Sequence, residues 1–329
     1  MDSEVAAAPV KSRRVYEWAP TAKPTLADLR AGGAKARGWI DYWIFGQIQD
    51  RLYLVLYAVL RRLPVDWVSD FGAHLGWFVV RKFKPKTVEG ARRNFRRLRP
   101  DWSDAEVDAA IDRLYRHIGR VMTEFAILTR LEGEGRITIH NGSALLEARK
   151  RGPVIVVSCH TGNWEVGASA MNMLGMKWAD FYVPPNSEVQ HKLANEIRET
   201  FGIKMLPPGR AGVRPAIREL NSGGCLSVFC DEVHFETVMA PFFGREPHID
   251  GNLAIAARLA RLTGAQIVVG YTVRTQACRF EVFFEEAIEL PKGPQNPSQL
   301  LDDVKMLNAR IEPIVAAHLD QWYFLDNDF

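Results

Sequence analysis

The sequence predicts an α/β protein with a mainly parallel central sheet flanked by helices. From about residue 135 onward, short apolar segments alternate with amphipathic segments of helical length, as in chains that build parallel sheets with helices on both faces. Two of the short segments, 153–159 and 225–230, are apolar apart from one serine each, which is typical of strands buried on both faces. The 329 residues, 47% of them hydrophobic, are sufficient for one large core with appendages.

The chain is expected to have three parts. Residues 1–37 contain Pro, Ala and scattered Lys and Arg without an apolar core, so a mobile N-terminal extension is expected there. Residues 38–130 read as mostly helical and are expected to associate with a membrane and pack on the core. Residues 131–329 form the α/β core.

The clearest helix of the helical part covers residues 103–128. Ser103 followed by Glu106 forms a capping box, and apolar residues then recur every three or four positions. A second segment with helical spacing covers residues 65–83.

In the α/β part, strands and helices are predicted in alternation. The strands are expected at 136–141, 153–159, 180–184, 203–207, 225–230, 265–274 and 279–290. The helices are expected at 142–152, 163–175, 187–202, 213–224, 250–264 and 297–322, the third of them capped by Ser187 and the fifth by Asp250.

Charge is distributed unevenly although the net charge is only +3. Residues 81–99 carry nine Lys or Arg residues and one acid, Glu89. Such a block suits a solvated face, an anionic membrane surface or a nucleic acid. The four cysteines lie in or beside apolar runs without a C-x-x-C pair, which predicts reduced, buried thiols in a cytoplasmic protein.

No clean transmembrane helix is predicted. The nearest segment, 39–64, is interrupted by Asp41, Asp50 and Arg51, which leaves an apolar run of only 52–60. Its aromatic residues and basic flanks fit a helix lying in the membrane interface, and a buried core helix is the alternative. The basic block that follows favours the membrane.

The strongest candidate for a functional site is the stretch "VIVVSCHTGNWEVGASAM", where a buried strand passes into a helix. His160 lies at the end of that strand, and Asp231 lies at the end of another. Ligands of parallel sheets bind beyond these strand ends. Glu165, in the first turn of the next helix, is expected to fold back and hold one ring nitrogen of His160, which leaves the other nitrogen free as a base.

Several reaction classes lack their motifs. Cys159 and His160 are neighbours on an extended strand and point to opposite faces, so they are poorly placed to act together. No G-x-S-x-G, H-E-x-x-H, dense Cys/His set, P-loop or dinucleotide loop occurs. The remaining option is that His160 deprotonates a hydroxyl of an acceptor, which then attacks an acyl donor directly.

At this point the sequence resembles the bacterial lipid A biosynthesis acyltransferases, the lauroyl/myristoyl transferase type of the lysophospholipid acyltransferase superfamily. His160 and Glu165 fit the H-x4-D/E signature. Four further segments resemble family motifs in the same order, with Phe95 replacing the usual Leu and Glu232 standing where Gln is frequent. They are "NFRRLRPDWS", "YVPPNSEVQHKLANEIRETFG", the block from Cys230 to Tyr271, and "EPIVAAHLDQWYF". The likeness covers roughly residues 50–325.

The resemblance implies that His160 is the general base, that Glu165 orients it, and that Arg198 occupies a family position suited to binding substrate. Arg210 and Arg214 are further candidates, because guanidinium groups suit phosphates or an oxyanion.

Three other residues are candidate substrate-binding or site-organising groups. Asn163 is either a helix cap or a ligand. Trp164 either lines an acyl channel or packs in the core. Asp231 either caps the strand end or organises the site.

The expected reaction transfers a fatty acyl chain from an acyl carrier protein or coenzyme A thioester to a hydroxyl of a lipid A precursor. It needs neither a metal nor an organic cofactor. The expected location is the cytoplasmic face of the bacterial inner membrane, with peripheral attachment to anionic lipid and no nucleic-acid partner. A glycerophospholipid, ornithine lipid or mannolipid acceptor remains an alternative, as does a non-catalytic membrane-binding scaffold.

Overall fold

The computed structural model describes residues 22–234 and 236–329 and has an α/β fold, as predicted. A seven-stranded sheet has the order β1-β9-β8-β2-β5-β3-β4. Its strands are β1 (Ile137–His140), β2 (Val154–Ser158), β3 (Trp178–Phe181), β4 (Ile203–Leu206), β5 (Cys225–Phe229), β8 (Gln266–Gln276) and β9 (Arg279–Phe284). A small antiparallel pair is formed by β6 (Val233–His234) and β7 (Thr237–Val238).

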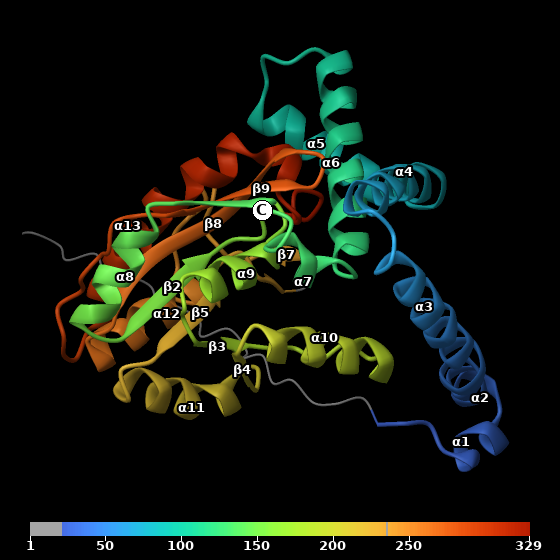
Figure 1. Ribbon diagram of the computed structural model, residues 1–329, viewed down its shortest axis with the longest axis horizontal. Coiled ribbons are helices and arrows are strands. Elements are labelled where there is room, and N and C mark those ends of the chain that lie inside the picture. Colours follow the sequence, from blue (N-terminus) through green and yellow to red (C-terminus); the bar gives the residue numbers. More distant parts are fainter. Residues whose placement is uncertain (1–21, 235) are drawn as a thin grey trace, which may run out of the picture.

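Helices cover both faces of the sheet (Figure 1). In the α/β part they are α8 (Gly142–Arg151), α9 (Val166–Met173), α10 (Glu188–Thr200), α11 (Arg210–Asn221), α12 (Asn252–Thr263) and α13 (Pro297–Ala317), followed by the short helix η2 (Leu319–Gln321). Before the sheet come α1 (Leu26–Ala31), α2 (Gly33–Ile40), η1 (Asp41–Gly46), α3 (Gln47–Leu60), α4 (Val65–Phe83), α5 (Pro85–Leu98), α6 (Asp104–Glu124) and α7 (Leu128–Leu131).

The sheet is mostly parallel because helical crossovers connect most of its strands. The exception is the hairpin of β8 and β9, which pair antiparallel, and β1 then pairs parallel with β9. At the centre, β2 lies between β5 and β8 and pairs parallel with both. The carboxyl ends of β2 and β5 therefore lie next to each other, at the same end of these two central strands.

Some element boundaries differ from those predicted. β3 begins at Trp178 rather than at residue 180, because the strand starts as soon as the chain leaves the turn at Gly175. Helix α12 is capped by Gly251 rather than by Asp250. Of the expected extension 1–37, residues 1–21 lie outside the described residues, whereas α1 and the first part of α2 are helical.

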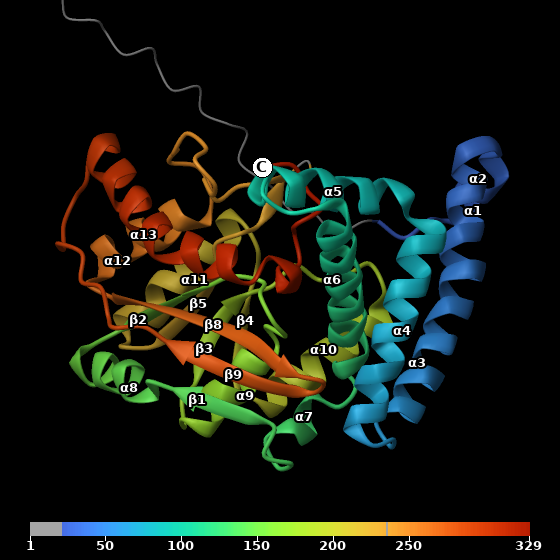
Figure 2. The same cartoon turned by 90° about the horizontal axis from the view of Figure 1, so that it is seen from above.

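Helices α4 and α6 pack side by side against one end of the sheet (Figure 2). Their backbones approach closely at glycines. A Cβ built on Gly119 would lie 2.1 Å from the carbonyl oxygen of Gly72, and one on Gly76 would lie 2.5 Å from the carbonyl oxygen of Tyr115. This close contact fixes α6 beside the strand ends.

The basic block of residues 81–99 is partly paired within the protein. Four of its arginines bind aspartates, in the pairs Arg81–Asp112, Arg92–Asp108, Arg93–Asp328 and Arg96–Asp104. The lysines of the block are exposed. Ion pairs thus compensate four of the nine basic residues, which leaves the block a smaller free positive charge than its composition indicates.

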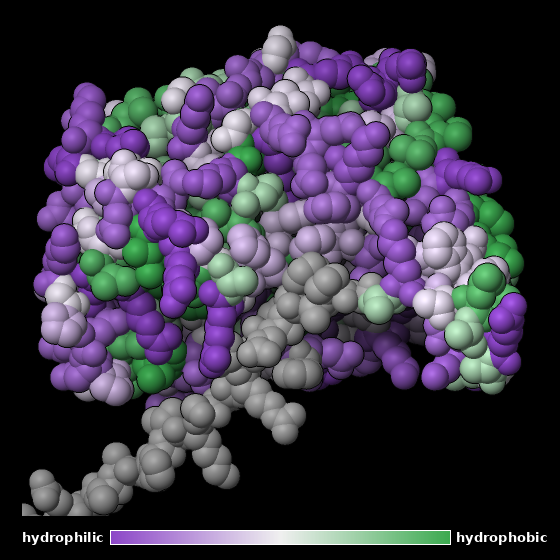
Figure 3. All heavy atoms as spheres, turned by 90° about the horizontal axis from the view of Figure 1, so that it is seen from below, coloured by the Kyte–Doolittle hydropathy of each residue, from purple (hydrophilic) through white to green (hydrophobic). Residues whose placement is uncertain are grey.

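The N-terminal helices expose many large apolar side chains. On η1 and α3 they are Trp43, Ile44, Phe45, Ile48, Leu52, Leu54, Val55, Leu56 and Val59, and on α4 they are Trp67, Phe71, Leu75, Phe78 and Phe83. Figure 3 shows hydrophobic residues along the right-hand side, where these helices lie in Figures 1 and 2. Among the helices of the described residues, none is sufficiently long and apolar to cross a membrane.

Candidate active site

The register of two neighbouring strands brings His160 and Asp231 together. Ser158 on β2 pairs with Phe229 on β5, and the amide of Cys230 donates to the carbonyl oxygen of Ser158 at 2.8 Å. His160 and Asp231 each follow two residues later. They therefore lie opposite each other just beyond the sheet, as expected for a ligand site of this fold.

Asp231 binds the imidazole of His160 directly. Its Oδ1 accepts from His160 Nδ1 at 2.8 Å, and its Oδ2 accepts from the His160 backbone amide at 2.8 Å. The same Oδ2 accepts from Trp322 Nε1 at 2.8 Å, and the aspartate is fully buried. A carboxylate on Nδ1 fixes the proton there and leaves Nε2 unprotonated, as a general base requires.

The expected contact between Glu165 and His160 is not the one that forms. Glu165 Oε1 accepts from Arg198 Nη2 at 3.3 Å, while the imidazole pairs with Asp231. The pairing of β2 with β5 explains the difference, because it places the carboxylate of Asp231 directly beside the imidazole ring of His160. Glu165 and His160 nevertheless both line one cavity, which is described below. Their catalytic roles stay predictions.

Arg198 and Tyr182 both line the cavity and contact each other. Its guanidinium carbon is 4.5 Å from the Tyr182 ring centre. Its Nη2 binds Glu165, and its buried Nη1 has no hydrogen-bond partner among the described residues. A guanidinium N–H held in this way is available to a ligand in the cavity.

A cavity of about 270 Å³ opens beside His160 between α9 and one face of the sheet. Its wall is mixed, with apolar residues outnumbering polar ones. The apolar lining residues are Val156, Trp164, Gly167, Ala168, Met171, Trp178, Phe181, Val183, Ile203, Phe229, Gly270, Val282 and Phe284. Trp164 thus lines the cavity, and its ring also packs edge-on against His160 at 5.0 Å. Such a cavity suits a flexible apolar ligand whose polar end reaches His160.

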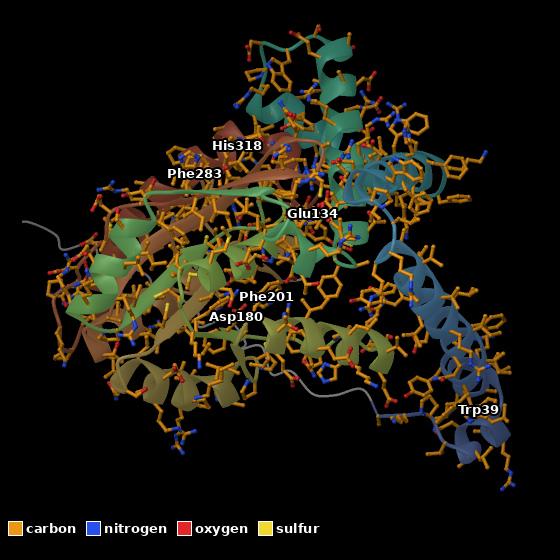
Figure 4. All side chains as sticks on the ribbon, viewed as in Figure 1. Trp39, Glu134, Asp180, Phe201, Phe283 and His318 are labelled. Atoms are coloured by element: carbon orange, nitrogen blue, oxygen red, sulfur yellow. The ribbon has the colours of Figure 1, made fainter. Side chains whose placement is uncertain are left out.

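Asp180 is a polar group in this cavity that the sequence interpretation missed. It lies on β3 and lines the cavity, and Figure 4 labels its position on the ribbon. Burial raises the pKa of Asp180 to about 7, opposed by the charge of Arg198 and reinforced by that of Glu165. The alternation of β3 could have placed Asp180 on the same face as Trp178, but the cavity itself is a tertiary feature.

Asn163 supports the loop that carries His160 and does not line the cavity. Its side chain is buried, with Nδ2 donating to Glu124 at 2.8 Å and Oδ1 accepting from the Glu165 amide at 3.3 Å. Glu124 is itself buried and forms a double hydrogen bond with Arg274. The residue that caps α9 is Glu165, so Asn163 supports the loop before the helix, and its expected role as a cap or ligand stays a prediction.

Arg210 and Arg214 are exposed on α11 and do not line the cavity beside His160. Both side chains face solvent. Their expected binding of substrate stays a prediction.

The thiols show no sign of a nucleophile. All four cysteines are free and buried, and burial raises the pKa of the Cys159 thiol, so the thiolate is disfavoured. No group of three or more His, Cys, Asp or Glu side chains suited to a metal ion occurs within residues 22–234 and 236–329.

Fold and site together define a class of enzyme in which a carboxylate-held histidine meets an apolar cavity beyond a parallel sheet. The chain belongs to the bacterial lipid A biosynthesis acyltransferase family, whose profile matches residues 39–329. It is thus an acyltransferase.

Comparison with solved structures includes the 1-acyl-sn-glycerophosphate (LPA) acyltransferase PlsC from Thermotoga maritima. The match has 16% sequence identity and a TM-score of 0.35, and it covers 77% of this chain and 98% of that chain. A search of curated proteins gave no match.

Proposed function

We propose that this protein transfers a fatty acyl chain from an acyl carrier protein thioester to a hydroxyl of a lipid A precursor, with His160 as general base. The observation that carries the proposal is the hydrogen bond between the buried Asp231 and Nδ1 of His160, a residue that lines the cavity. Family membership supports the lipid A precursor as acceptor.

In the proposed reaction, His160 Nε2 takes the proton of the acceptor hydroxyl as its oxygen attacks the thioester carbon. The carbonyl oxygen becomes an oxyanion, and we assign its stabilisation to Arg198, whose buried Nη1 has no hydrogen-bond partner among the described residues. The carbon–sulfur bond then breaks. The leaving thiolate takes the proton from the imidazolium, which restores neutral His160.

Asp231 contributes by orientation and charge. It holds the ring through Nδ1 and stabilises the imidazolium while the proton resides on Nε2. General-base catalysis of this kind contributes about 10²–10⁴-fold to the rate. Trp322, the second residue of the C-terminal Gln-Trp, donates a hydrogen bond to Asp231 and so helps to keep this carboxylate in position beside His160.

The proposed location is the cytoplasmic face of the inner membrane, with peripheral attachment. The exposed apolar side chains of η1, α3 and α4 support it, because burying them in the lipid interface is favourable. The exposed lysines of residues 81–99 adjoin α4 and add attraction to anionic lipid.

The test is mass spectrometry of lipid A from cells lacking this gene, complemented with wild type, His160→Ala or His140→Ala. His140 is a matched control, because it is half-exposed and pairs with Glu281 away from the cavity. Loss of one secondary acyl chain, restored by wild type and by the control but not by His160→Ala, is expected. Unchanged lipid A in a strain without redundant transferases would contradict the lipid A acceptor. The purified enzyme, supplied with acyl carrier protein or coenzyme A thioesters, then identifies the donor.

A further inference from the structure

A second cavity, of about 240 Å³, lies outside the candidate active site and is lined mainly by residues of α6. Figures 1 and 2 show where this helix lies. Arg113, Arg116 and Arg120 recur at helical spacing on one face of α6, and Arg274 comes from β8. The remaining lining residues are His117, Asp320 and Gln321. Four guanidinium groups thus line this second cavity, which we call the arginine cavity.

Carboxylates compensate three of these arginines. Arg113 Nε pairs with Asp320 at 2.6 Å, Arg120 with Asp70 at 2.8 Å, and Arg274 with the buried Glu124 at 2.6 Å.

Arg116 is different. Its Nη1 contacts His74 Nδ1 at 3.3 Å, and its guanidinium lies 5.3 Å from the Trp77 ring centre. Among the described residues it has no carboxylate partner. One positive charge of the cavity is therefore uncompensated.

The histidine of the cavity does not add charge. Burial, together with the charge of Arg274, lowers the pKa of His117 well below its ordinary value. Arg274 Nε donates to His117 Nδ1 at 3.1 Å, so the imidazole proton lies on Nε2. That Nε2 donates to the carbonyl oxygen of Gly162 at 3.0 Å.

This hydrogen bond joins the cavity to the loop of the candidate active site. Gly162 is two residues from His160, and Gln321 exchanges two hydrogen bonds with the backbone of Arg274. The amide of Tyr323 then donates to the His160 carbonyl oxygen at 2.9 Å. The arginine cavity and the apolar cavity are thus attached to the same short loop.

We propose that the arginine cavity binds a phosphate group, with the uncompensated Arg116 as its main ligand and Arg113, which the phosphate would share with Asp320, as a second. A guanidinium group can donate two hydrogen bonds to two oxygens of one phosphate. Several convergent arginines favour a phosphate dianion over a singly charged carboxylate as their ligand. The assignment of the source rests on the proposed function: the phosphate is that of the glycolipid acceptor, whose hydroxyl then reaches His160. A phosphate of the thioester donor has the same chemistry and is the other source.

The first experiment uses steady-state kinetics of the full-length enzyme with Arg116→Gln, Arg113→Gln and the control Arg258→Gln. Arg258 is exposed on α12, away from both cavities. For Arg116→Gln we expect an increase in KM for the phosphorylated acceptor of about tenfold, with a smaller change in kcat. Removing the phosphate from the acceptor should raise the wild-type KM similarly and abolish the difference between wild type and variant.

The outcomes distinguish the sources. A change confined to the KM of the acceptor assigns its phosphate to the cavity, and a change confined to the KM of the thioester assigns the phosphate of the donor. Unchanged KM values for both substrates in folded Arg116→Gln and Arg113→Gln overturn the proposal.

A second measurement separates this site from the proposed function. Inorganic phosphate, compared with chloride at equal ionic strength, should raise the melting temperature of wild type and of Arg258→Gln but not of Arg116→Gln. An equal effect on all three proteins, or none on wild type, refutes the phosphate site. If wild type fails to acylate lipid A precursors but shows the Arg116-dependent shift, the acceptor is wrong and the site stands.

Discussion

Replacing Asp231 by Asn should reverse the imidazole tautomer of His160 while preserving the fold. Oδ2 of Asp231 accepts from both the His160 amide and Trp322 Nε1, so the Asn carbonyl oxygen will occupy that place. The Asn NH₂ group must then face His160 Nδ1, where Oδ1 now accepts. An NH₂ donor can pair only with unprotonated Nδ1. The ring proton therefore moves to Nε2, and the base is lost.

The expected loss in kcat is about 10²–10⁴-fold, the usual contribution of a general base, or about 3–5.5 kcal/mol in the activation free energy. Thermal stability should change little because both hydrogen bonds to Oδ2 persist. The assay is acyl transfer by purified protein, with product detected by mass spectrometry.

The matched control is Glu232→Gln at the next position. Burial raises the pKa of Glu232 to about 8, so this carboxyl is mostly neutral at pH 7 and Gln is a close substitute. Activity of folded Asp231→Asn within about threefold of wild type would refute the tautomer argument, since a lost base costs at least about a hundredfold. Asp231→Asn should also cause no further loss in a His160→Ala background.

Three further substitutions test the surroundings of the site. The pKa of Asp180 rises from 3.8 to about 7 on folding, so the folded state holds the proton more tightly. The free energy of unfolding should therefore fall between about pH 4 and pH 7, by up to about 4 kcal/mol, and Asp180→Asn should remove this slope in urea titrations. Glu124→Ala leaves Arg274 buried without its carboxylate and should cost about 3–5 kcal/mol, measured by chemical denaturation. Gly162→Ala places a Cβ 2.3 Å from the Thr272 carbonyl oxygen at a φ of +55°, so it should destabilise the protein by about 1–3 kcal/mol and lower kcat; full activity would show that this loop is not constrained.

Local patterns in the sequence were sufficient for the elements and the fold class. The capping boxes and apolar periodicity that predicted helices such as α6 depend on residues within a few positions of one another. The predominantly apolar strands β2 and β5 indicated a buried parallel sheet, and the sharp change of composition after β2 marked His160 as a candidate. Such signals survive in a single sequence because the interactions behind them are local.

The partners of His160 were decided by the tertiary structure. Sequence spacing favoured Glu165, five residues away, whereas the adjacency of β2 and β5 placed Asp231 on the ring. The same holds for Asp180 in the apolar cavity and for Arg274 beside α6. Strand order is set by packing of the whole sheet, so a contact between residues seventy positions apart has no local signature, and only the folded chain brings these groups together.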